Sequence, residues 1–330
     1  MAHVLITGGS GLIGWRVVES LVELGHDVVV LDSQPNHANL EPVADKITVV
    51  AGSVTDLPTI LRVMKRHHVD HVIHLAALVT QFALRDPAAA FQVNTLGTAN
   101  IFEAADALEA KRVVWTSSVT ALSAPDDYDN TLVAEEYPRI STHPYGASKF
   151  GAEIVANRFV QDRGLDIIGI RPALVYGIGR LGGGAGLFNE AVRRLALEKS
   201  TELLGSSTLH QPIYNKDMAQ LLVQALFVDR PEHHLFNVPT LKAYTNEELE
   251  AELSAAFPDA DVRVAPAPDY IPKVPAVDGS RAQRELGFTP RYSLVDGVRE
   301  LVDLFRGGDA TTDVRPSTAL PTSSTGQGTR

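Results

Sequence analysis

Short, continuous apolar runs that alternate with helix-like segments constrain the fold of this chain more than any other feature. In the first half and just beyond it, these runs occupy residues 4–7, 28–31, 47–50, 72–75, 112–116 and 167–170. Continuous apolar strands separated by helices indicate a parallel sheet that is covered on both faces. Right-handed crossovers between such strands give a doubly wound α/β fold.

A change of texture after Tyr176 predicts a second part of the chain. We expect a Rossmann domain over residues 1–175 and mainly a substrate-binding lobe over 176–305. The last residues, 306–330, contain almost no large apolar side chains and are expected to be disordered. The run at 235–238 is typical of one more strand of the main sheet, so we expect the chain to return there from the lobe.

Local patterns predict further elements of this lobe. Glycine is frequent over residues 177–186, which we expect to be mobile, and a helix should follow over 187–199. Thr245 and Glu248 have the spacing of a capping box, because a hydroxyl at the cap is followed by a carboxylate three residues on. This pair predicts a helix that continues through Ala256.

Composition excludes several classes of protein. Apolar residues make up 45% and charged residues 21% of the chain, as is usual for a soluble globular protein. A net charge of −11 argues against nucleic acid or an anionic membrane surface as a main partner. Without cysteine there is no disulfide and no thiolate metal site. No apolar run approaches the roughly 20 residues that span a bilayer, so we expect a cytoplasmic protein.

The first strand opens directly into a glycine-rich loop that contains Gly8, Gly11 and Gly14. This spacing lets the backbone turn tightly and approach a pyrophosphate held over the N-terminus of the next helix. We therefore predict that the loop, with Leu12 and Ile13, binds a dinucleotide. The alternative is a purely structural turn.

Acidic residues after the second and third strands bear on the adenosine half of that dinucleotide. Asp32 ends the second strand, where a carboxylate accepts hydrogen bonds from both ribose hydroxyls and repels a 2′-phosphate, which favours NAD over NADP. After the third strand, Ser53 and Val54 are candidate cofactor contacts. For Asp56 two interpretations stay open: a helix cap and an adenine contact.

Tyr145 and Lys149 lie four residues apart and therefore share one face of a helix. A free tyrosine has a pKa near 10, and lowering it by about 3 units takes roughly 4 kcal/mol of interaction with positive charge. A tyrosine tuned in this way can take a hydroxyl proton while hydride leaves for a nicotinamide. Ser117 and Ser118 follow the strand at 112–116, at the edge of the sheet where ligands bind. Ser118 is our candidate to bind the reacting oxygen, whereas Ser117 is equally well explained as a turn residue.

In combination, these motifs resemble the extended short-chain dehydrogenase/reductase family, within the NAD-dependent epimerase/dehydratase group that contains UDP-galactose 4-epimerase. The resemblance extends to about Phe305. It rests on T-G-G-S-G-L-I-G at 7–14, H-L-A-A at 74–77, Asn94 with Gly97-Thr98, Ser117-Ser118, Y-G-A-S-K at 145–149, R-P-A-L-V-Y-G at 171–177 and E-L-G-F-T-P at 285–290.

The resemblance implies a catalytic triad of Ser118, Tyr145 and Lys149. It also implies that Leu75 and Ala76 line the cofactor and that Asn94 organises the active-site helix and water. The matched segments supply the remaining candidate contacts to NAD, which are Ala77, Asn94, Ser117, Tyr145, Lys149 and Pro172. A homodimer through the helices around residues 88–108 and 144–161 is a further implication.

Departures from the family pattern bear on the substrate. Ser117-Ser118-Val119 replaces the Thr-Asp-Glu of the dehydratases, which disfavours dehydration. His210 stands where nucleotide-sugar enzymes usually place an arginine that pairs with the diphosphate, and a neutral histidine is a poor replacement. The cations that could compensate are Arg180, Arg193, Arg194 and Lys273.

We therefore predict an NAD-dependent oxidoreductase that acts on a secondary alcohol or ketone of a small, sugar-like substrate. One alternative is a UDP-sugar 4-epimerase with tightly bound NAD, and another is a non-catalytic regulator that senses NAD. We predict no metal site, because His71 and His74 lie three apart along a strand and face opposite sides. We expect the acidic residues 126–129 to form a solvated surface or lid.

Overall fold

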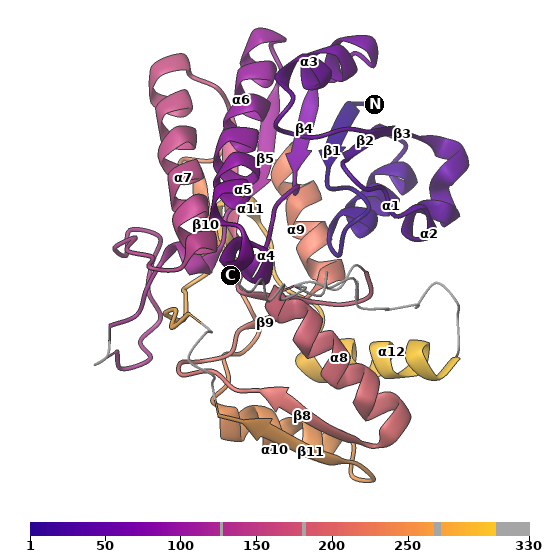
Figure 1. Ribbon diagram of the computed structural model, residues 1–330, viewed down its shortest axis with the longest axis vertical. Helices are drawn as coiled ribbons and strands as arrows, with labels where there is room; N and C mark the ends of the chain where they lie inside the picture. The colour runs from indigo at the N-terminus through magenta and orange to yellow at the C-terminus, as the bar shows by residue number, and fades with distance from the viewer. Residues whose placement is uncertain (126–127, 180–182, 267–271, 308–330) are drawn as a thin grey trace, which may run out of the picture.

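The computed structural model describes residues 1–125, 128–179, 183–266 and 272–307. Within these residues the main sheet has seven strands in the order β3-β2-β1-β4-β5-β6-β10, and every neighbouring pair is parallel. The strands are β1 (His3–Thr7), β2 (Asp27–Asp32), β3 (Ile47–Ala51), β4 (His71–His74), β5 (Arg112–Thr116), β6 (Ile167–Arg171) and β10 (Leu235–Asn237). The predicted doubly wound sheet is confirmed, including the late strand that returns from the lobe (Figure 1).

Helices cover both faces of this sheet, as the apolar strands require. One face packs on α1 (Gly14–Glu23), α9 (Asn215–Phe227) and α11 (Ser280–Leu286). The other face packs on α3 (Leu57–Arg66), α6 (Gly97–Ala107) and α7 (Pro144–Arg163). Shorter helices are α2 (His37–Leu40), η1 (Glu41–Lys46), α4 (Thr80–Arg85), α5 (Pro87–Phe91) and η3 (Val119–Ala121).

The helix expected around residues 88–108 is interrupted. A π-helical turn, η2 (Gln92–Leu96), joins α5 to α6. At its centre the buried Asn94 side chain bonds to both the backbone N–H and the carbonyl of Leu78. π-Turns within helices commonly mark functional sites, and this one faces the segment that follows β4.

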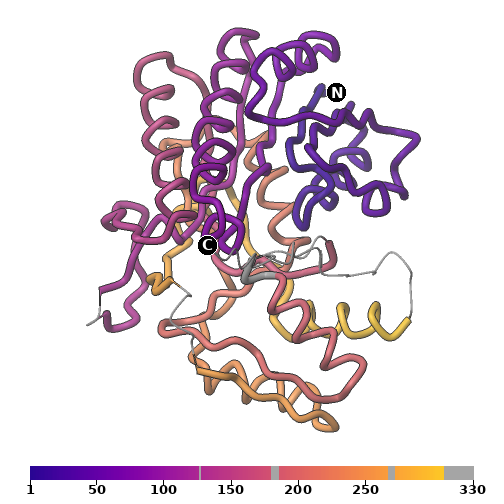
Figure 2. Tube along the Cα trace, viewed as in Figure 1, coloured from indigo at the N-terminus to yellow at the C-terminus, as the bar shows by residue number. Residues whose placement is uncertain are grey.

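A smaller part of the molecule lies below the sheet in the view of Figure 1. It contains α8 (Gly183–Glu198), α10 (Asn246–Ala256), α12 (Leu294–Gly307) and the parallel pair β8 (Ser200–Leu204) and β11 (Asp261–Ala265), which share a hydrophobic core. A second parallel pair, β7 (Leu174–Tyr176) and β9 (Pro212–Tyr214), connects this part to the sheet. Figure 2 shows that the chain passes repeatedly between the two parts.

Two local predictions for the lobe can be compared with the structure. The capping box is confirmed, because Thr245 Oγ1 accepts from the Glu248 N–H and the Glu248 carboxylate accepts from the Thr245 N–H. Helix α8 begins at Gly183, four residues before the predicted start. The tail was predicted over residues 306–330, but Arg306 and Gly307 are the last residues of helix α12, and the rest lies outside the described residues. Arg180 and residues 126–127 of the acidic segment also lie outside them. No helix within the described ranges is long and apolar enough to cross a membrane.

Candidate active site

The loop between β1 and α1 brings backbone atoms into contact where side chains would not fit. Gly8 has a φ of +70°, and a Cβ on it would lie 2.8 Å from the Ala76 nitrogen. A Cβ on Gly14 would lie 2.3 Å from the Gly8 carbonyl oxygen. A Cβ on Gly11 meets only that same oxygen, at 3.2 Å, so the outer rim of the loop is open. The loop therefore offers bare backbone at the N-terminus of α1, which fits the pyrophosphate of a dinucleotide.

Asp32, at the end of β2, also braces this loop. Its Oδ2 accepts a hydrogen bond from the Ser10 hydroxyl at 2.7 Å, and its Oδ1 accepts one from the Gln34 N–H at 3.0 Å. Asn39 holds the Ser10 carbonyl from α2. A carboxylate accepts about four hydrogen bonds, so acceptor capacity remains for ribose hydroxyls.

The segment after β7 lies across the outer side of the same loop. Asn215, at the start of α9, donates to the carbonyls of both Leu12 and Ile178. The Trp15 indole also donates to Ile178, at 2.8 Å. Gly179 has a φ of +147°, and a Cβ there would lie 2.7 Å from the Leu12 Cα. The glycine loop, with Leu12 and Ile13, therefore lies where the sheet meets the lobe.

After β3, the predicted contacts are held mainly by the protein itself. The Asp56 carboxylate accepts from the Thr59 N–H at 3.1 Å and from its hydroxyl at 2.6 Å, so Asp56 caps α3. The Val54 side chain is buried against Gly97, and its carbonyl accepts from Asn100. The Ser53 hydroxyl pairs with that of Thr55. Of the two interpretations of Asp56, the structure shows the helix cap.

Residues 75–77 follow β4 and face the glycine loop, with the Ala76 backbone against Gly8. The Thr7 hydroxyl contacts the Ala76 N–H at 3.3 Å and the buried His74 at 2.6 Å. The second ring nitrogen of His74 contacts Thr98 at 2.9 Å, and burial lowers the pKa of His74 to about 3. Both nitrogens of His74 are thus engaged by hydroxyl groups, in a neutral bridge between β1, β4 and α6.

The π-turn joins this segment to the catalytic helix. Asn94 donates to the Ser148 hydroxyl at 2.9 Å, and Ser148 lies between the two predicted catalytic residues on α7. Asn94 therefore fixes the segment after β4 relative to α7.

Helix α7 carries Tyr145 and Lys149 in its first two turns, and His143 caps it by accepting from the Tyr145 N–H. A Cβ on Gly146 would lie 1.9 Å from the Thr120 carbonyl oxygen, so η3 approaches α7 only because residue 146 is glycine. This approach brings Ser118 into hydrogen-bonding contact with Tyr145. Lys149 is buried, and its Nζ donates to the Thr116 carbonyl at 2.7 Å.

The protein's own groups do not make Tyr145 acidic. Burial raises the pKa of Tyr145 to about 12, although the hydrogen bond with Ser118 acts in the opposite direction. Burial also lowers the pKa of Lys149 to about 8, while the negative charge of Glu153 raises it. The Lys149 Nζ lies 6.0 Å from the centre of the Tyr145 ring. Deprotonation of Tyr145 near neutral pH therefore needs positive charge beyond that of Lys149.

Glu153, one turn after Lys149, was not predicted from the sequence. Both its oxygens accept from Arg171 at 2.7 Å, and Oε1 also accepts from the Ser117 hydroxyl at 2.6 Å. Ser117 thus points to a buried ion pair rather than to its neighbour Ser118. Its spacing in the sequence could have indicated it, because Glu153 follows Lys149 by four residues and Tyr145 by eight and so lies on the same face of the helix. Pro172, next to Arg171, holds η3 through its carbonyl, which accepts from Val119.

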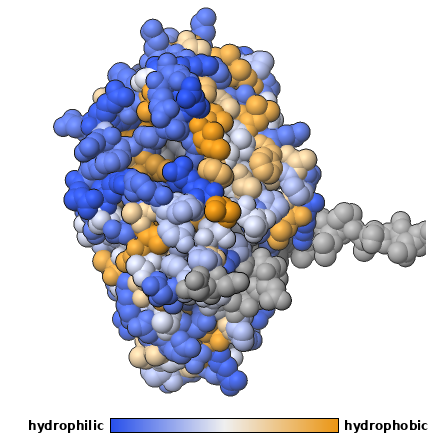
Figure 3. Space-filling model, turned by 90° about the vertical axis from the view of Figure 1, so that its left-hand side faces the viewer, coloured by the Kyte–Doolittle hydropathy of each residue, from blue (hydrophilic) through white to orange (hydrophobic). Residues whose placement is uncertain are grey.

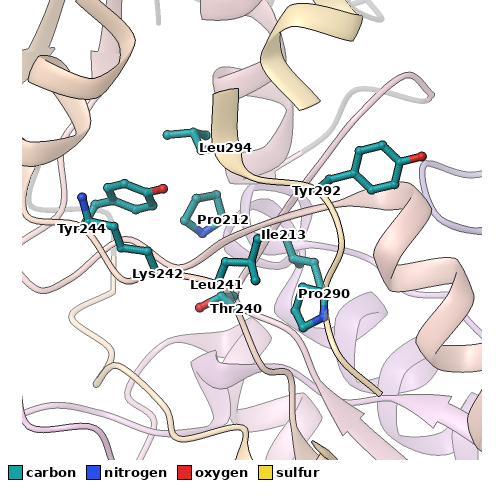
Figure 4. A pocket seen from close by; sticks show the side chains of 9 residues that line it. All are labelled: Pro212, Ile213, Thr240, Leu241, Lys242, Tyr244, Pro290, Tyr292 and Leu294. Atoms are coloured by element: carbon teal, nitrogen blue, oxygen red, sulfur yellow. The ribbon is translucent and has the colours of Figure 1, made fainter. Parts of the chain in front are cut away.

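The described residues that were considered for diphosphate binding have partners in the protein. His210 contacts the Asn246 side chain at 2.7 Å, and burial lowers the pKa of His210. Arg193 and Arg194 both pair with Glu190 on α8. The small pocket of Figure 4 has Tyr244 and Tyr292 on opposite sides, and Tyr244 is joined to His210 by two backbone hydrogen bonds. None of the predicted catalytic or cofactor residues lines it.

Comparisons with known proteins show the family and the fold of this chain. A model of the NAD dependent epimerase/dehydratase family matches residues 4–238. The UDP-glucose 4-epimerase of Mycolicibacterium smegmatis is 28% identical over 323 residues, which cover 92% of this chain and 98% of that protein. A crystal structure of the Thermus thermophilus UDP-glucose 4-epimerase complex with NAD is 26% identical, with a TM-score of 0.80 over 93% of this chain and 99% of that one. L-threonine dehydrogenase of Clostridium difficile shares the fold, with a TM-score of 0.83 at 22% identity over 93% and 98% of the two chains.

Proposed function

The chain belongs to the NAD dependent epimerase/dehydratase family, and we propose that it catalyses hydride transfer between NAD and a secondary alcohol or ketone through Ser118, Tyr145 and Lys149. Membership confirms the resemblance seen in the sequence and makes the protein an NAD-dependent enzyme. The observation that carries the proposal is the contact of Ser118 with Tyr145, one helical turn from the buried Lys149.

The roles of the three side chains follow from their contacts. The Ser118 oxygen accepts from the N–H and the hydroxyl of Thr120, at 3.2 and 2.8 Å, so its own hydrogen is left to donate to Tyr145 or, in its place, to a substrate oxygen bound beside Tyr145. Tyr145 takes the substrate hydroxyl proton on its phenolate oxygen. NAD, when bound in this family, supplies the hydride acceptor and a cationic ring. That positive charge and Lys149 oppose the effect of burial on the pKa of Tyr145.

We propose a small, hydroxylated, sugar-like substrate without a diphosphate. The support is the state of the residues that would pair with a diphosphate: His210 is bound to Asn246, and Arg193 and Arg194 are bound to Glu190. A neutral imidazole that is already hydrogen-bonded within the protein contributes little to the binding of a dianion.

A UDP-sugar 4-epimerase is the second candidate. Its support is the identity of the relatives, since the M. smegmatis protein and the T. thermophilus structure are both described as UDP-glucose 4-epimerases. An epimerase oxidises its sugar transiently and returns the hydride to the other face, so NAD stays bound and no net oxidation occurs.

One experiment separates the two candidates. The purified protein is tested for retained NAD and then assayed for NADH formation with sugars, sugar acids, secondary alcohols and UDP-sugars. NADH released with a free alcohol supports the dehydrogenase. Retained NAD with interconversion of UDP-sugars and no free NADH rejects it in favour of the epimerase.

Replacement of the proposed base tests the shared mechanism. Tyr145→Phe removes the phenol but keeps the ring, so turnover should fall by roughly 10²–10⁴. Binding of NAD and the melting temperature should change little, which shows that the fold is intact. Turnover near that of the unmodified protein would rule out Tyr145 as the acid/base.

We also propose that the protein is a homodimer. Apolar side chains are exposed on adjacent elements α4, α5, η2 and α7, namely Phe82, Phe91, Leu96 and Ile154. Figure 3 views the molecule from the side of α7 and shows hydrophobic side chains among the polar ones. An apolar surface of this kind is typical of an interface.

A further inference from the structure

The glycine loop is held at two points by side chains from outside it. At Ser10 the support comes from Asp32, at the end of the neighbouring strand β2. At Leu12 it comes from Asn215, which lies 203 residues further along the chain and begins α9. Between these two points lies Gly11, whose open side lets the backbone approach a pyrophosphate. The predicted pyrophosphate site is therefore supported on one side by the chain as it returns from the lobe.

Asn215 uses both hydrogens of its side-chain amide for this support. The residue is 0% exposed, and its Nδ2 donates to the Leu12 carbonyl at 3.1 Å and to the Ile178 carbonyl at 3.0 Å. Burial of an amide costs free energy unless the amide is hydrogen-bonded, so these two bonds stabilise the buried position of Asn215. Asn215 thus joins the glycine loop to the segment that follows β7.

The backbone of this segment fits closely against the loop because two of its residues are glycines. Gly177 and Gly179 have φ values of +144° and +147°, which residues with side chains rarely adopt. A Cβ on Gly177 would overlap the Asn215 side chain, and one on Gly179 would overlap the Leu12 backbone. Glycine at both positions therefore permits the close contact with the loop.

Two further side chains hold the segment in place. The Trp15 indole on α1 donates to the Ile178 carbonyl at 2.8 Å, so this carbonyl accepts from both α1 and α9. Asn189, which is 1% exposed, donates to the Gly177 carbonyl at 2.7 Å and accepts from the Gly177 N–H at 3.1 Å. Asn189 lies on α8, in the lobe (Figure 1). The contact with the loop is therefore anchored in both parts of the molecule.

We propose that Asn215 and Trp15 are positioning residues for NAD, which keep the turn at Gly11 and Leu12 in the conformation that binds the pyrophosphate. A ligand that requires one conformation of a loop binds more weakly when the loop spends part of its time in others. Both residues act through the loop rather than through the reacting groups. The proposal rests on the predicted binding of NAD at the glycine loop and is independent of the reaction and substrate proposed above.

Calorimetric titration of NAD and of ADP into protein freed of retained nucleotide tests this role. ADP carries the diphosphate without the nicotinamide, so both ligands report on the loop. Asn215→Leu removes two hydrogen bonds and should raise both dissociation constants by roughly tenfold. Trp15→Phe removes only the indole N–H and should raise them by roughly threefold.

Asn237→Leu is the matched control for Asn215→Leu. Asn237 is also 0% exposed and also donates to two carbonyls, those of Val133 and Asp278. It ends the edge strand β10, which three strands separate from β1 and its glycine loop. Both variants should lower the melting temperature, but Asn237→Leu should leave both dissociation constants unchanged. This difference separates positioning of the loop from general stabilisation of the fold.

Trp15→Phe alone decides the test if Asn215→Leu does not fold, because it leaves an aromatic ring in a half-buried position. Unchanged dissociation constants, an equal increase in Asn237→Leu, or weaker binding of NAD without weaker binding of ADP would each overturn the proposal. So would a failure of the unmodified protein to bind either nucleotide. Failure of the proposed reaction alone leaves these binding constants unaffected, so the two failures are distinguishable.

Discussion

Asp32 has two roles, and the sequence pattern predicts only one of them. Its position after β2 predicts recognition of the adenosine ribose, and the structure adds that Oδ2 anchors Ser10 within the glycine loop. A substitution aimed at nucleotide preference therefore also loosens the loop. Lys149 also has two roles, because it interacts with Tyr145 and donates a hydrogen bond to the Thr116 carbonyl.

Nucleotide preference can be tested with a control for the bracing role. Asp32→Ala combined with Ser33→Arg should move the ratio of dissociation constants toward NADP, because a repelling carboxylate is replaced by a cation. Ser10→Ala removes the hydrogen bond to Asp32 without changing the charge, so it should weaken the binding of both nucleotides to the same extent. Tighter binding of NADP than NAD by the unmodified protein would contradict this interpretation of Asp32.

Lys149 should make stability depend on pH in the nucleotide-free protein. Its pKa is 10.5 in the unfolded reference and about 8 in the fold. Between these values the unfolded chain holds a proton that the folded protein has lost, so stability rises with pH, by at most roughly 3 kcal/mol. Tyr145, raised from 10.0 to about 12, has the opposite effect above pH 10. Denaturant unfolding from pH 8 to 10 should show the rise, and Lys149→Met should abolish it. An unchanged slope in that variant would exclude Lys149 as its source.

At the scale of elements, the site depends on the contact between α7 and η3. Gly146 permits this contact, because the Thr120 carbonyl occupies the space of a side chain. The contact holds Ser118 beside Tyr145, and the π-turn fixes the opposite side of α7 through Asn94 and Ser148.

Two glycines of α7 form a matched pair of test sites. Gly146→Ala should displace η3 and lower turnover far more than it lowers NAD affinity. Gly151→Ala meets only the Thr95 side chain, at 3.3 Å, and replaces a poor helix former, so it should leave turnover near normal. Steady-state kinetics and nucleotide titration measure both effects. Equal turnover in the two variants would refute the role given to this contact.

The sequence predicts some elements better than others for physical reasons. The seven strands of the main sheet are visible because each is a continuous apolar run. The pairs β7–β9 and β8–β11 were not predicted, since they consist of three to five residues and pair with partners far along the chain. The π-turn was missed because its apolar pattern does not differ from that of an α-helix. Within the site, Glu153 was missed because burial of its ion pair depends on tertiary packing.

At the scale of the whole molecule, the sheet and the lobe together frame the proposed site. Residues 177–179 after β7 contact the glycine loop, while α9 returns from the lobe to pack on the sheet. The division into residues 1–175 and 176–305 stays a prediction, as does a disordered tail beyond residue 307.

Assembly can be tested with two apolar residues of similar exposure. Ile154 on α7 is 50% exposed and Leu197 on α8 is 53% exposed. The unmodified protein should scatter light as a dimer at micromolar concentration. Ile154→Glu should yield monomers by placing a charge in the interface, whereas Leu197→Glu should not. A monomeric unmodified protein would end the proposal.

The late position of β10 also governs the order of events during synthesis. Strand β6 pairs with β5 on one side, and its other partner emerges only after β7, α8, β8, β9 and α9 have been translated. Until then a nascent chain carries an unpaired strand edge and the apolar sheet face that α9 later covers. Such surfaces invite association with other unfinished chains. We therefore expect the nascent chain to be prone to aggregation for as long as residue 237 is missing, and chaperone demand to fall once β10 is in place.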